Sequence, residues 1–178
     1  GRAAGVRVAV LADTHLRSAP IAGRRPARTL PAGAWERLRA ADHILHAGDV
    51  LDAGVLDELR AVAPLHAVLG NNDVGLERLL PPTLVVELAG VRIAMIHDSG
   101  PGRGRAARLH RRFPDAAVVV FGHSHIPVDE EGDAGQRLFN PGSPTQKRAQ
   151  PVATMGELEL AGGAVVAHRI VPLAEPSG

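Results

Sequence analysis

Short apolar runs that end in polar, metal-capable side chains recur along the sequence and constrain the fold more than any other feature. Residues 6–11 run into the tripeptide DTH, and residues 116–121 run into the tetrapeptide GHSH. Apolar runs of this length between turn residues are typical of buried strands. In α/β sheets, ligands bind just beyond the carboxyl ends of the strands. We therefore expect these polar residues to gather along one edge of a sheet.

Five predicted strands end in this way and supply seven candidate metal ligands: Asp13, His15, Asp49, Asn71, His97, His123 and His125. In an extended segment, residues i and i+2 point to the same side. We therefore expect DTH and GHSH each to direct two side chains toward one site. A single histidine of this kind is more often a hydrogen-bonded structural residue, but seven candidates at five strand ends favour a binding site.

Helices alternate with strands early in the sequence, and antiparallel hairpins follow late. Helices are expected over three segments: residues 34–41, 52–63 and 102–112. Asp52 is the expected N-cap of the second helix. Ala89-Gly90 and Gly162-Gly163 each predict a tight turn between two strands, and residues 17–33 are expected to form a long loop. The pattern indicates a single α/β domain over residues 1–178 with a mixed sheet.

Composition argues against several classes of function. The chain has no cysteine, which excludes disulfides and thiolate metal sites. A net charge of +1 and an aromatic content of 2% do not favour a nucleic-acid polymer as partner. No apolar segment approaches the roughly 20 residues that cross a bilayer, and the first residues lack the apolar block of a signal peptide. We therefore expect a cytoplasmic protein without a membrane partner.

The candidate ligands suit two divalent metal ions. Carboxylate, amide and imidazole groups without thiolate are typical ligands of hard or borderline cations, and one carboxylate would bridge two ions about 3.5–4 Å apart. Two such ions outweigh the charges of Asp13 and Asp49, so the site would attract anions and stabilise charge developing on a phosphoryl group. A metal-bound water, with its pKa lowered from about 15.7 toward about 7, would supply the nucleophile.

The order of these motifs resembles that of the calcineurin-like metallophosphoesterases. The resemblance rests on DTH, on GD at 48–49, on GNND at 70–73, on His97 and on GHSH. The context HAGD and the tetrapeptide NPGS at 140–143 are most similar to the small bacterial and archaeal phosphodiesterase branch of that family. The resemblance covers roughly residues 5–145. It implies a four-layer α/β/β/α sandwich of two mixed sheets flanked by helices.

The same resemblance implies a ligand set for each metal ion. One ion would be bound by Asp13, His15 and His125, the other by Asn71, His97 and His123, and Asp49 would bridge the two. Mn²⁺ is the expected cofactor, with Fe, Ni, Zn or Co as alternatives. The expected partner is a small-molecule phosphoester, with cyclic nucleotides among the candidates, and a homo-oligomer stays open because relatives are often dimers or tetramers.

Three positions depart from the family pattern. Asn72 stands where much of the family has a histidine, and an amide can donate a hydrogen bond to phosphate but cannot deliver a proton. We therefore expect Asn72 to bind phosphate and the reaction to depend on good leaving groups. Asp98 replaces a glycine and either caps the following turn, which we favour, or contacts a ligand imidazole. The third departure is Leu16, where relatives often carry glycine.

The loop after Leu16 contains Arg24, Arg25 and Arg28. These arginines are more often a solvated surface than a lid that grips phosphate, and we favour the surface. The buried-strand residue His46 is expected to be structural or to support a ligand, and Asp73 is expected to tie down its own loop. The arginine-rich segment 103–112 is expected to be a solvated helix face.

Three functions follow from these expectations. The favoured one is a metal-dependent phosphodiesterase that acts on small or activated diesters. The second is a phosphomonoesterase that uses the same site. The third is a non-catalytic scaffold that uses the same fold for protein contacts, as a retromer subunit does. A scaffold would be expected to lose ligands, whereas every ligand position is filled in this sequence.

Overall fold

The computed structural model describes residues 5–16 and 29–173, and its core is a pair of five-stranded mixed sheets. The strands of sheet A are β1 (Val6–Leu11), β2 (His43–His46), β3 (Leu65–Ala67), β9 (Ala153–Ala161) and β10 (Ala164–Leu173). Their order is β10-β9-β1-β2-β3. The pairs β1–β2 and β2–β3 are parallel, whereas β1–β9 and β9–β10 are antiparallel.

Sheet B has a matching organisation. Its strands are β4 (Thr83–Leu88), β5 (Val91–Ile96), β6 (Val118–Val120), β7 (Val128–Glu131) and β8 (Arg137–Asn140). Their order is β4-β5-β6-β8-β7. The pairs β5–β6 and β6–β8 are parallel, and the outer pairs β4–β5 and β7–β8 are antiparallel.

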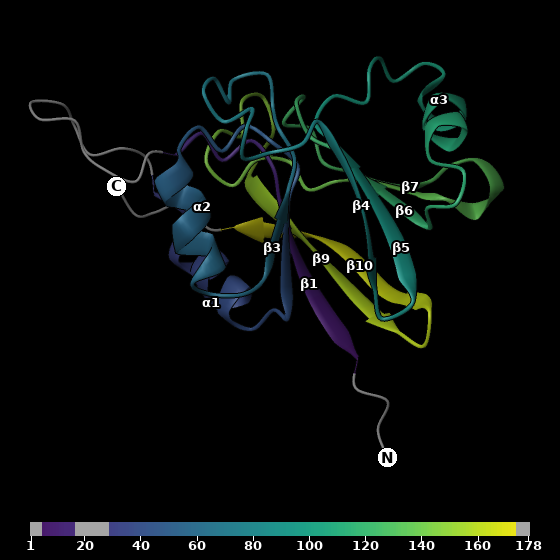
Figure 1. Cartoon of the computed structure of the whole chain (residues 1–178), viewed down its shortest axis with the longest axis horizontal. Coiled ribbons are helices and arrows are strands. Elements are labelled where there is room, and N and C mark those ends of the chain that lie inside the picture. Colours follow the sequence, from purple (N-terminus) through teal and green to yellow (C-terminus); the bar gives the residue numbers. More distant parts are fainter. Residues whose placement is uncertain (1–4, 17–28, 174–178) are drawn as a thin grey trace, which may run out of the picture.

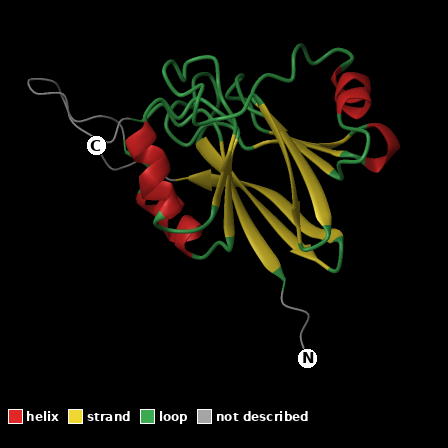
Figure 2. Ribbon diagram, in the orientation of Figure 1, coloured by secondary structure: helices red, strands yellow, loops and turns green. Residues whose placement is uncertain are grey.

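Helices cover the outer faces of both sheets, which confirms the predicted four-layer sandwich. Helices α1 (Ala32–Arg39) and α2 (Ala53–Arg60) share an apolar cluster with sheet A, and α3 (Arg105–Arg112) shares one with sheet B. Figures 1 and 2 show the helices on opposite sides of the paired sheets. Among the described residues, no helix is long and apolar enough to cross a membrane.

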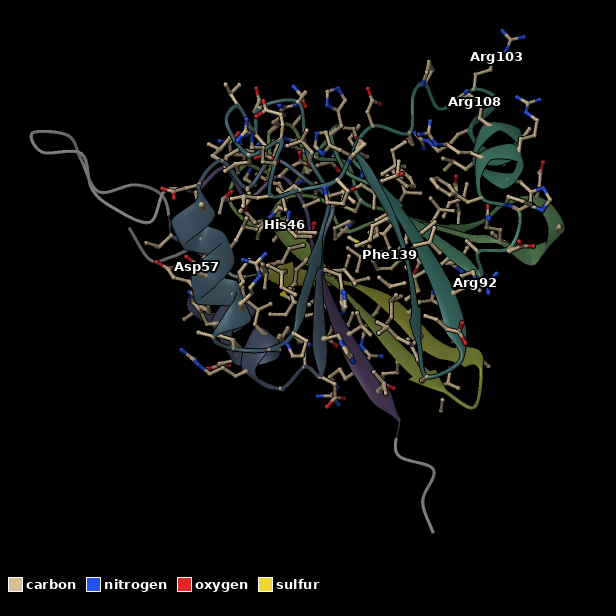
Figure 3. The ribbon with its side chains drawn as sticks, viewed as in Figure 1. His46, Asp57, Arg92, Arg103, Arg108 and Phe139 are labelled. Atoms are coloured by element: carbon tan, nitrogen blue, oxygen red, sulfur yellow. The ribbon has the colours of Figure 1, made fainter. Side chains whose placement is uncertain are left out.

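Strand β1 shows why the apolar runs in the sequence are continuous rather than alternating. Ala9 and Leu11 pack into the cluster beneath α1 and α2, whereas Val8 and Val10 pack into the cluster between the two sheets. Both faces of the strand are therefore buried, as expected for a central strand of a layered sheet. Phe139 of β8 belongs to the same inter-sheet cluster and lies between the sheets in Figure 3.

The local signals in the sequence account for most element boundaries. Ala89 and Gly90 form the predicted tight turn with φ angles of 50° and 79°, values that a primed hairpin turn requires. The side chain of Asp52 accepts a hydrogen bond of 2.8 Å from the Gly54 amide, as predicted for the N-cap of α2. Residues 17–28, which include Arg24, Arg25 and Arg28, lie outside the described residues.

Two short elements were not predicted. Strand β7 is an edge strand with the sequence VDEE, and the 3₁₀ turn η1 (Asp133–Gly135) follows it. β7 buries little surface, so it carries no apolar run that could have marked it as a strand.

Candidate metal centre

The loops that follow β1, β2, β3, β5 and β6 meet at one end of the two sheets (Figure 1). These loops carry all seven candidate ligands, and direct contacts link the seven into one cluster. Two groups within it have ligand atoms close enough to hold a metal ion: Asp13, His15 and His125 in one, and Asp13, Asp49 and His97 in the other. The predicted convergence of the strand ends is therefore present in the structure.

The first group surrounds one carboxylate oxygen. Asp13 Oδ1 lies 3.9 Å from His15 Nε2 and 3.7 Å from His125 Nε2. All three atoms are buried and have no hydrogen-bond partner among the described residues. Buried polar atoms without partners are costly and rare. Two imidazole nitrogens and a carboxylate oxygen that face one point are a donor set that fits a divalent cation.

Asn71 and His123 extend the second group around Asp49 and His97. His97 Nε2 lies 3.3 Å from Asp49 Oδ2 and 2.9 Å from Asn71 Oδ1. The Nδ1 atom of His123 lies 3.2 Å from the same Asn71 oxygen. Asp49 Oδ2 is also 3.6 Å from His15 Nε2 of the first group. Asp49 therefore lies between the two groups, where a bridging carboxylate is expected.

The backbone at five of the candidate ligands is not extended, so the extended conformation expected for DTH and GHSH was wrong, although each motif does direct two side chains to the site. Asp13, His15, Asp49, His123 and His125 all have positive φ angles, between 47° and 75°. Left-handed backbone is uncommon for residues other than glycine, and it concentrates at functional sites. The side chains converge because each loop turns sharply just beyond its strand.

His46 links the first two of these loops. It is fully buried, and its Nδ1 accepts a hydrogen bond of 3.1 Å from the Gly48 amide. Nε2 must therefore carry the proton, and it donates to Thr14 Oγ1 at 2.9 Å. Burial lowers the pKa of His46 to about 3, so the ring is neutral. Figure 3 shows it at the base of the loops, in the supporting position that the sequence indicated.

A segment after the NPGS motif holds the first group from the other side. Ser143 Oγ donates to the backbone oxygen of Asp13 at 2.8 Å, and Thr145 Oγ1 donates to that of Thr14 at 2.6 Å. His125 Nδ1 donates to the backbone oxygen of Gln146 at 2.7 Å, which leaves its Nε2 free to bind a metal. The NPGS motif was expected to form a turn that props the His123–His125 loop, and Asn140 does so by donating to the Gly122 backbone oxygen at 3.2 Å and to Ser124 Oγ at 3.3 Å. The contacts of Thr145 and Gln146 were not predicted.

Asp73 and Asn72 hold Asp49 in place. The Asp73 carboxylate accepts hydrogen bonds from the amides of Asp49, Leu51 and Gly70 at 2.8–2.9 Å, so it fixes more than the loop assigned to it. The Asn72 backbone amide donates to Asp49 Oδ1 at 2.8 Å, and its side-chain amide donates to Oδ2 at 2.9 Å. A role of Asn72 in phosphate binding stays a prediction.

Asp98 lies beside His123 and caps a turn. Its Oδ1 accepts a hydrogen bond of 2.8 Å from the Gly100 amide, which is the cap that the sequence favoured. Its Oδ2 lies 3.9 Å from His123 Nε2, a distance beyond a hydrogen bond. Asp98 therefore places a carboxylate next to the exposed edge of this ring without bonding to it.

The electrostatics of the cluster also suit a cation. Burial raises the pKa of Asp13 to about 7, and the neighbouring Asp49 carboxylate adds to this effect. Burial acts in the same direction at Asp49, but hydrogen bonds from His97 and Asn72 hold its pKa below the usual range. Burial lowers the pKa of His15 and of His125, so both rings favour the neutral, metal-binding form. A bound cation would favour the ionised form of Asp13.

Comparison with known proteins gives a consistent result. Residues 6–163 match the family model described as the calcineurin-like phosphoesterase superfamily domain. Over 152 residues the chain is 32% identical to a "Probable metallophosphoesterase" of Methanothermobacter thermautotrophicus, and the match covers 83% of each protein.

Solved structures with lower identity share the fold. Vps29 from Entamoeba histolytica matches with a TM-score of 0.71 at 23% identity, covering 94% of this chain and 99% of that protein. A structure described as a novel archaeal phosphodiesterase matches with a TM-score of 0.66 at 18% identity, covering 94% of this chain and 99% of that protein.

Proposed function

Because this chain belongs to the calcineurin-like phosphoesterase superfamily, we propose that it hydrolyses small phosphodiesters with two divalent metal ions bound at the sheet edge. Membership of this family implies hydrolysis of phosphoesters. The observation that carries the proposal is the group of three buried, partnerless ligand atoms on Asp13, His15 and His125, with Asp49 beside it. The archaeal phosphodiesterase with the same fold supports the choice of a diester.

Seven residues of this chain would hold the two ions. Asp13, His15 and His125 would bind one ion, Asn71, His97 and His123 the other, and Asp49 would contact both. The contacts of His97 and His123 with Asn71 support this division, and His97 Nε2 also lies 3.8 Å from Asp13 Oδ1 of the first group. Mn²⁺ is the expected metal, and Fe, Ni, Zn or Co would suit the same carboxylate, amide and imidazole ligands.

Bound divalent ions would acidify water and neutralise negative charge that develops on the phosphoryl group. The protein contributes a rigid frame for these ligands, since His46, Asp73 and the segment 143–146 fix the loops by hydrogen bonds to their backbone. A frame that is set before substrate binds lowers the reorganisation needed during the reaction.

Asn72 would assist in binding the phosphoryl group. One N–H of its side-chain amide donates to Asp49, and the second N–H is left to donate to a phosphoryl oxygen. The amide has no proton to give to a leaving group. We therefore assign as preferred substrates aryl phosphodiesters, whose phenols leave readily, and cyclic phosphodiesters, whose leaving oxygen stays attached to the product when the ring opens.

The test compares a diester with a monoester on metal-restored protein. Chelated protein is assayed with Mn²⁺, Ni²⁺, Zn²⁺ or Co²⁺ on bis(4-nitrophenyl) phosphate and on 4-nitrophenyl phosphate, with Asp49→Asn as the inactive control. Faster cleavage of the diester supports the proposal, and faster cleavage of the monoester indicates a phosphomonoesterase. If the protein binds no metal and cleaves neither ester, the result would instead indicate a non-catalytic scaffold. The fold shared with Vps29 is the reason for testing this alternative.

A further inference from the structure

A cavity of about 340 Å³ lies between the loop after β5 and helix α3. Asp98 and Gly100 contribute from the loop, Ile96 from the end of β5, and Arg108, Leu109 and Arg112 from the helix. A volume near the lower end of the usual range for ligand pockets suits one ring-sized group rather than a polymer. None of these lining residues belongs to the candidate ligands.

Asp98 connects this cavity to the metal centre. It lines the cavity, and its Oδ2 lies 3.9 Å from Nε2 of His123, a candidate ligand of the second ion. The other ring nitrogen of His123 faces Asn71. The cavity therefore shares the Asp98 side chain with the surroundings of His123, which places it next to the second group of ligands.

Arg108 of helix α3, labelled in Figure 3, keeps the wall of the cavity in place. Its guanidinium donates to the backbone oxygens of Ser99, Pro101 and Arg103 at 2.6–2.9 Å, so the loop wraps around the charge. Gly100 has a φ of 78°, and a Cβ atom there would lie 2.9 Å from the Arg108 guanidinium. Arg108 is thus part of the cavity wall, not of a solvated helix face as the sequence suggested.

The charge of the lining favours an anion. Within residues 29–173, neither Arg108 nor Arg112 lies within ion-pair distance of a carboxylate. Arg112 is exposed, its guanidinium lies 5.6 Å from the centroid of the Phe113 ring, and it also lines a neighbouring cavity of about 290 Å³. The one acidic lining residue, Asp98, uses Oδ1 to cap the Gly100 amide. Two arginines against one carboxylate leave the cavity positive, and Ile96 and Leu109 add an apolar wall.

We propose that this cavity binds the leaving group of the phosphodiester and selects leaving groups that carry a second negative charge on a ring. The assignment rests on the proposed function for its link to catalysis. Arg112 pairs with the anion through charge-assisted hydrogen bonds, and the ring packs on Ile96 and Leu109. Arg112 is therefore the residue that determines specificity, and Arg108 is a positioning residue.

The kinetic test uses methyl phenyl phosphate and methyl 4-carboxyphenyl phosphate with Mn²⁺-loaded protein. Arg112→Gln is expected to lower the ratio of kcat/KM for the carboxylated ester over the plain ester by about fivefold, the size of an exposed ion pair. The intrinsic reactivity of the two leaving groups cancels when this ratio is compared between variants. Arg111→Gln is the matched control, because Arg111 is also exposed and does not line the cavity. An unchanged ratio in Arg112→Gln overturns the assignment.

A binding test separates failure of this assignment from failure of the proposed function. The alcohol 4-hydroxybenzoate is titrated into ¹⁵N-labelled protein with phenol as the uncharged control, and the amide signals of Ser99 and Gly100 are followed. Shifts with 4-hydroxybenzoate that Arg112→Gln weakens support the cavity, even if neither ester is hydrolysed and the proposed function falls. The absence of such shifts in a protein that hydrolyses both esters overturns the cavity and leaves the proposed function standing.

Discussion

His97 Nε2 lies 3.3 Å from Asp49 Oδ2, and this contact joins the two sheets at the candidate metal centre. His97 follows β5 of sheet B, whereas Asp49 follows β2 of sheet A. The other ring nitrogen of His97 donates to the backbone oxygen of Ala47 at 2.7 Å, so sheet A also orients this ring. Packing of the apolar cluster between the sheets is therefore a condition for assembling the site.

Removing one imidazole from each group should remove one metal ion at a time. Because His125 and His97 belong to separate groups, His125→Ala and His97→Ala are each expected to lower the Mn²⁺ content from about two ions to about one per chain. Equilibrium dialysis with elemental analysis measures this content. His110→Ala, a change on helix α3, serves as the control. Two tightly held ions in His125→Ala would contradict the division into two groups.

Gly122 is required because a side chain at this position would collide with its neighbours, and not because its φ angle is positive. A Cβ atom at this position would lie 2.8 Å from Ala12 Cβ and 2.9 Å from Asp13 Oδ2, the oxygen that accepts a hydrogen bond from the His123 amide. Gly122→Ala should displace Asp13 and weaken Mn²⁺ binding by about tenfold, as measured by calorimetric titration. Gly5→Ala is the control, because its Cβ would make only an ordinary contact. Unchanged affinity in Gly122→Ala would contradict the expected displacement of Asp13.

Asn72 should make the rate depend on a good leaving group, because its amide cannot donate a proton to the departing alcohol. Asn72→His introduces a proton donor, which should raise the rate for an alkyl diester by at least about tenfold and change the rate for a bis-aryl diester little. Asn72→Gln retains an amide and should give no such gain. Steady-state kinetics on the two esters measures the effect. Equal rates for the alkyl ester in the wild-type protein and Asn72→His would rule out this account of Asn72.

His46 should make the fold sensitive to acid. Burial lowers its pKa to about 3 from the ordinary value of 6.5. The unfolded chain binds a proton below about pH 6.5 and the folded chain does not, so stability is full above this pH and falls as the pH drops toward 3. The free energy of unfolding should lose about 2 kcal/mol between pH 7 and pH 5 through this residue.

His46→Gln keeps a donor and an acceptor at this position but has no proton to gain. Urea unfolding of chelated protein at pH 7 and pH 5 should therefore show a loss about 2 kcal/mol smaller in the variant than in the wild-type protein. The difference isolates His46 from the other titrating groups. An equal loss in both proteins would mean that His46 is protonated in the folded state.

The apolar runs predicted a layered α/β fold because they depend on burial, whereas the four-layer arrangement was implied by the family resemblance. β1 has one set of side chains beneath the helices and another between the sheets, so its apolar run is uninterrupted and easy to recognise. The positions of Asp49 and His97 followed from the rule that strand ends share an edge.

The features that the sequence did not predict depend on backbone geometry. The spacing of His123 and His125 suggested an extended segment, but both residues have left-handed φ angles. Such strained backbone is imposed by the folded loops and cannot be recognised from the residue types. The role of Gln146 depends on a backbone oxygen, which every residue has. Arg108 was expected to be solvated because its partners are backbone carbonyl oxygens, such as that of Ser99. A sequence pattern can indicate an acidic side chain as partner, but not a backbone oxygen.

The number of divalent ions bound by the wild-type chain tests the central claim most directly. Chelated protein is dialysed against Mn²⁺, and its metal content is measured together with hydrolysis of bis(4-nitrophenyl) phosphate. The account predicts two ions per chain and activity that appears with them, both reduced in Asp49→Asn because Asp49 lies between the two groups. A chain that binds no ion at saturating Mn²⁺, or that binds two ions equally well without Asp49, would contradict it.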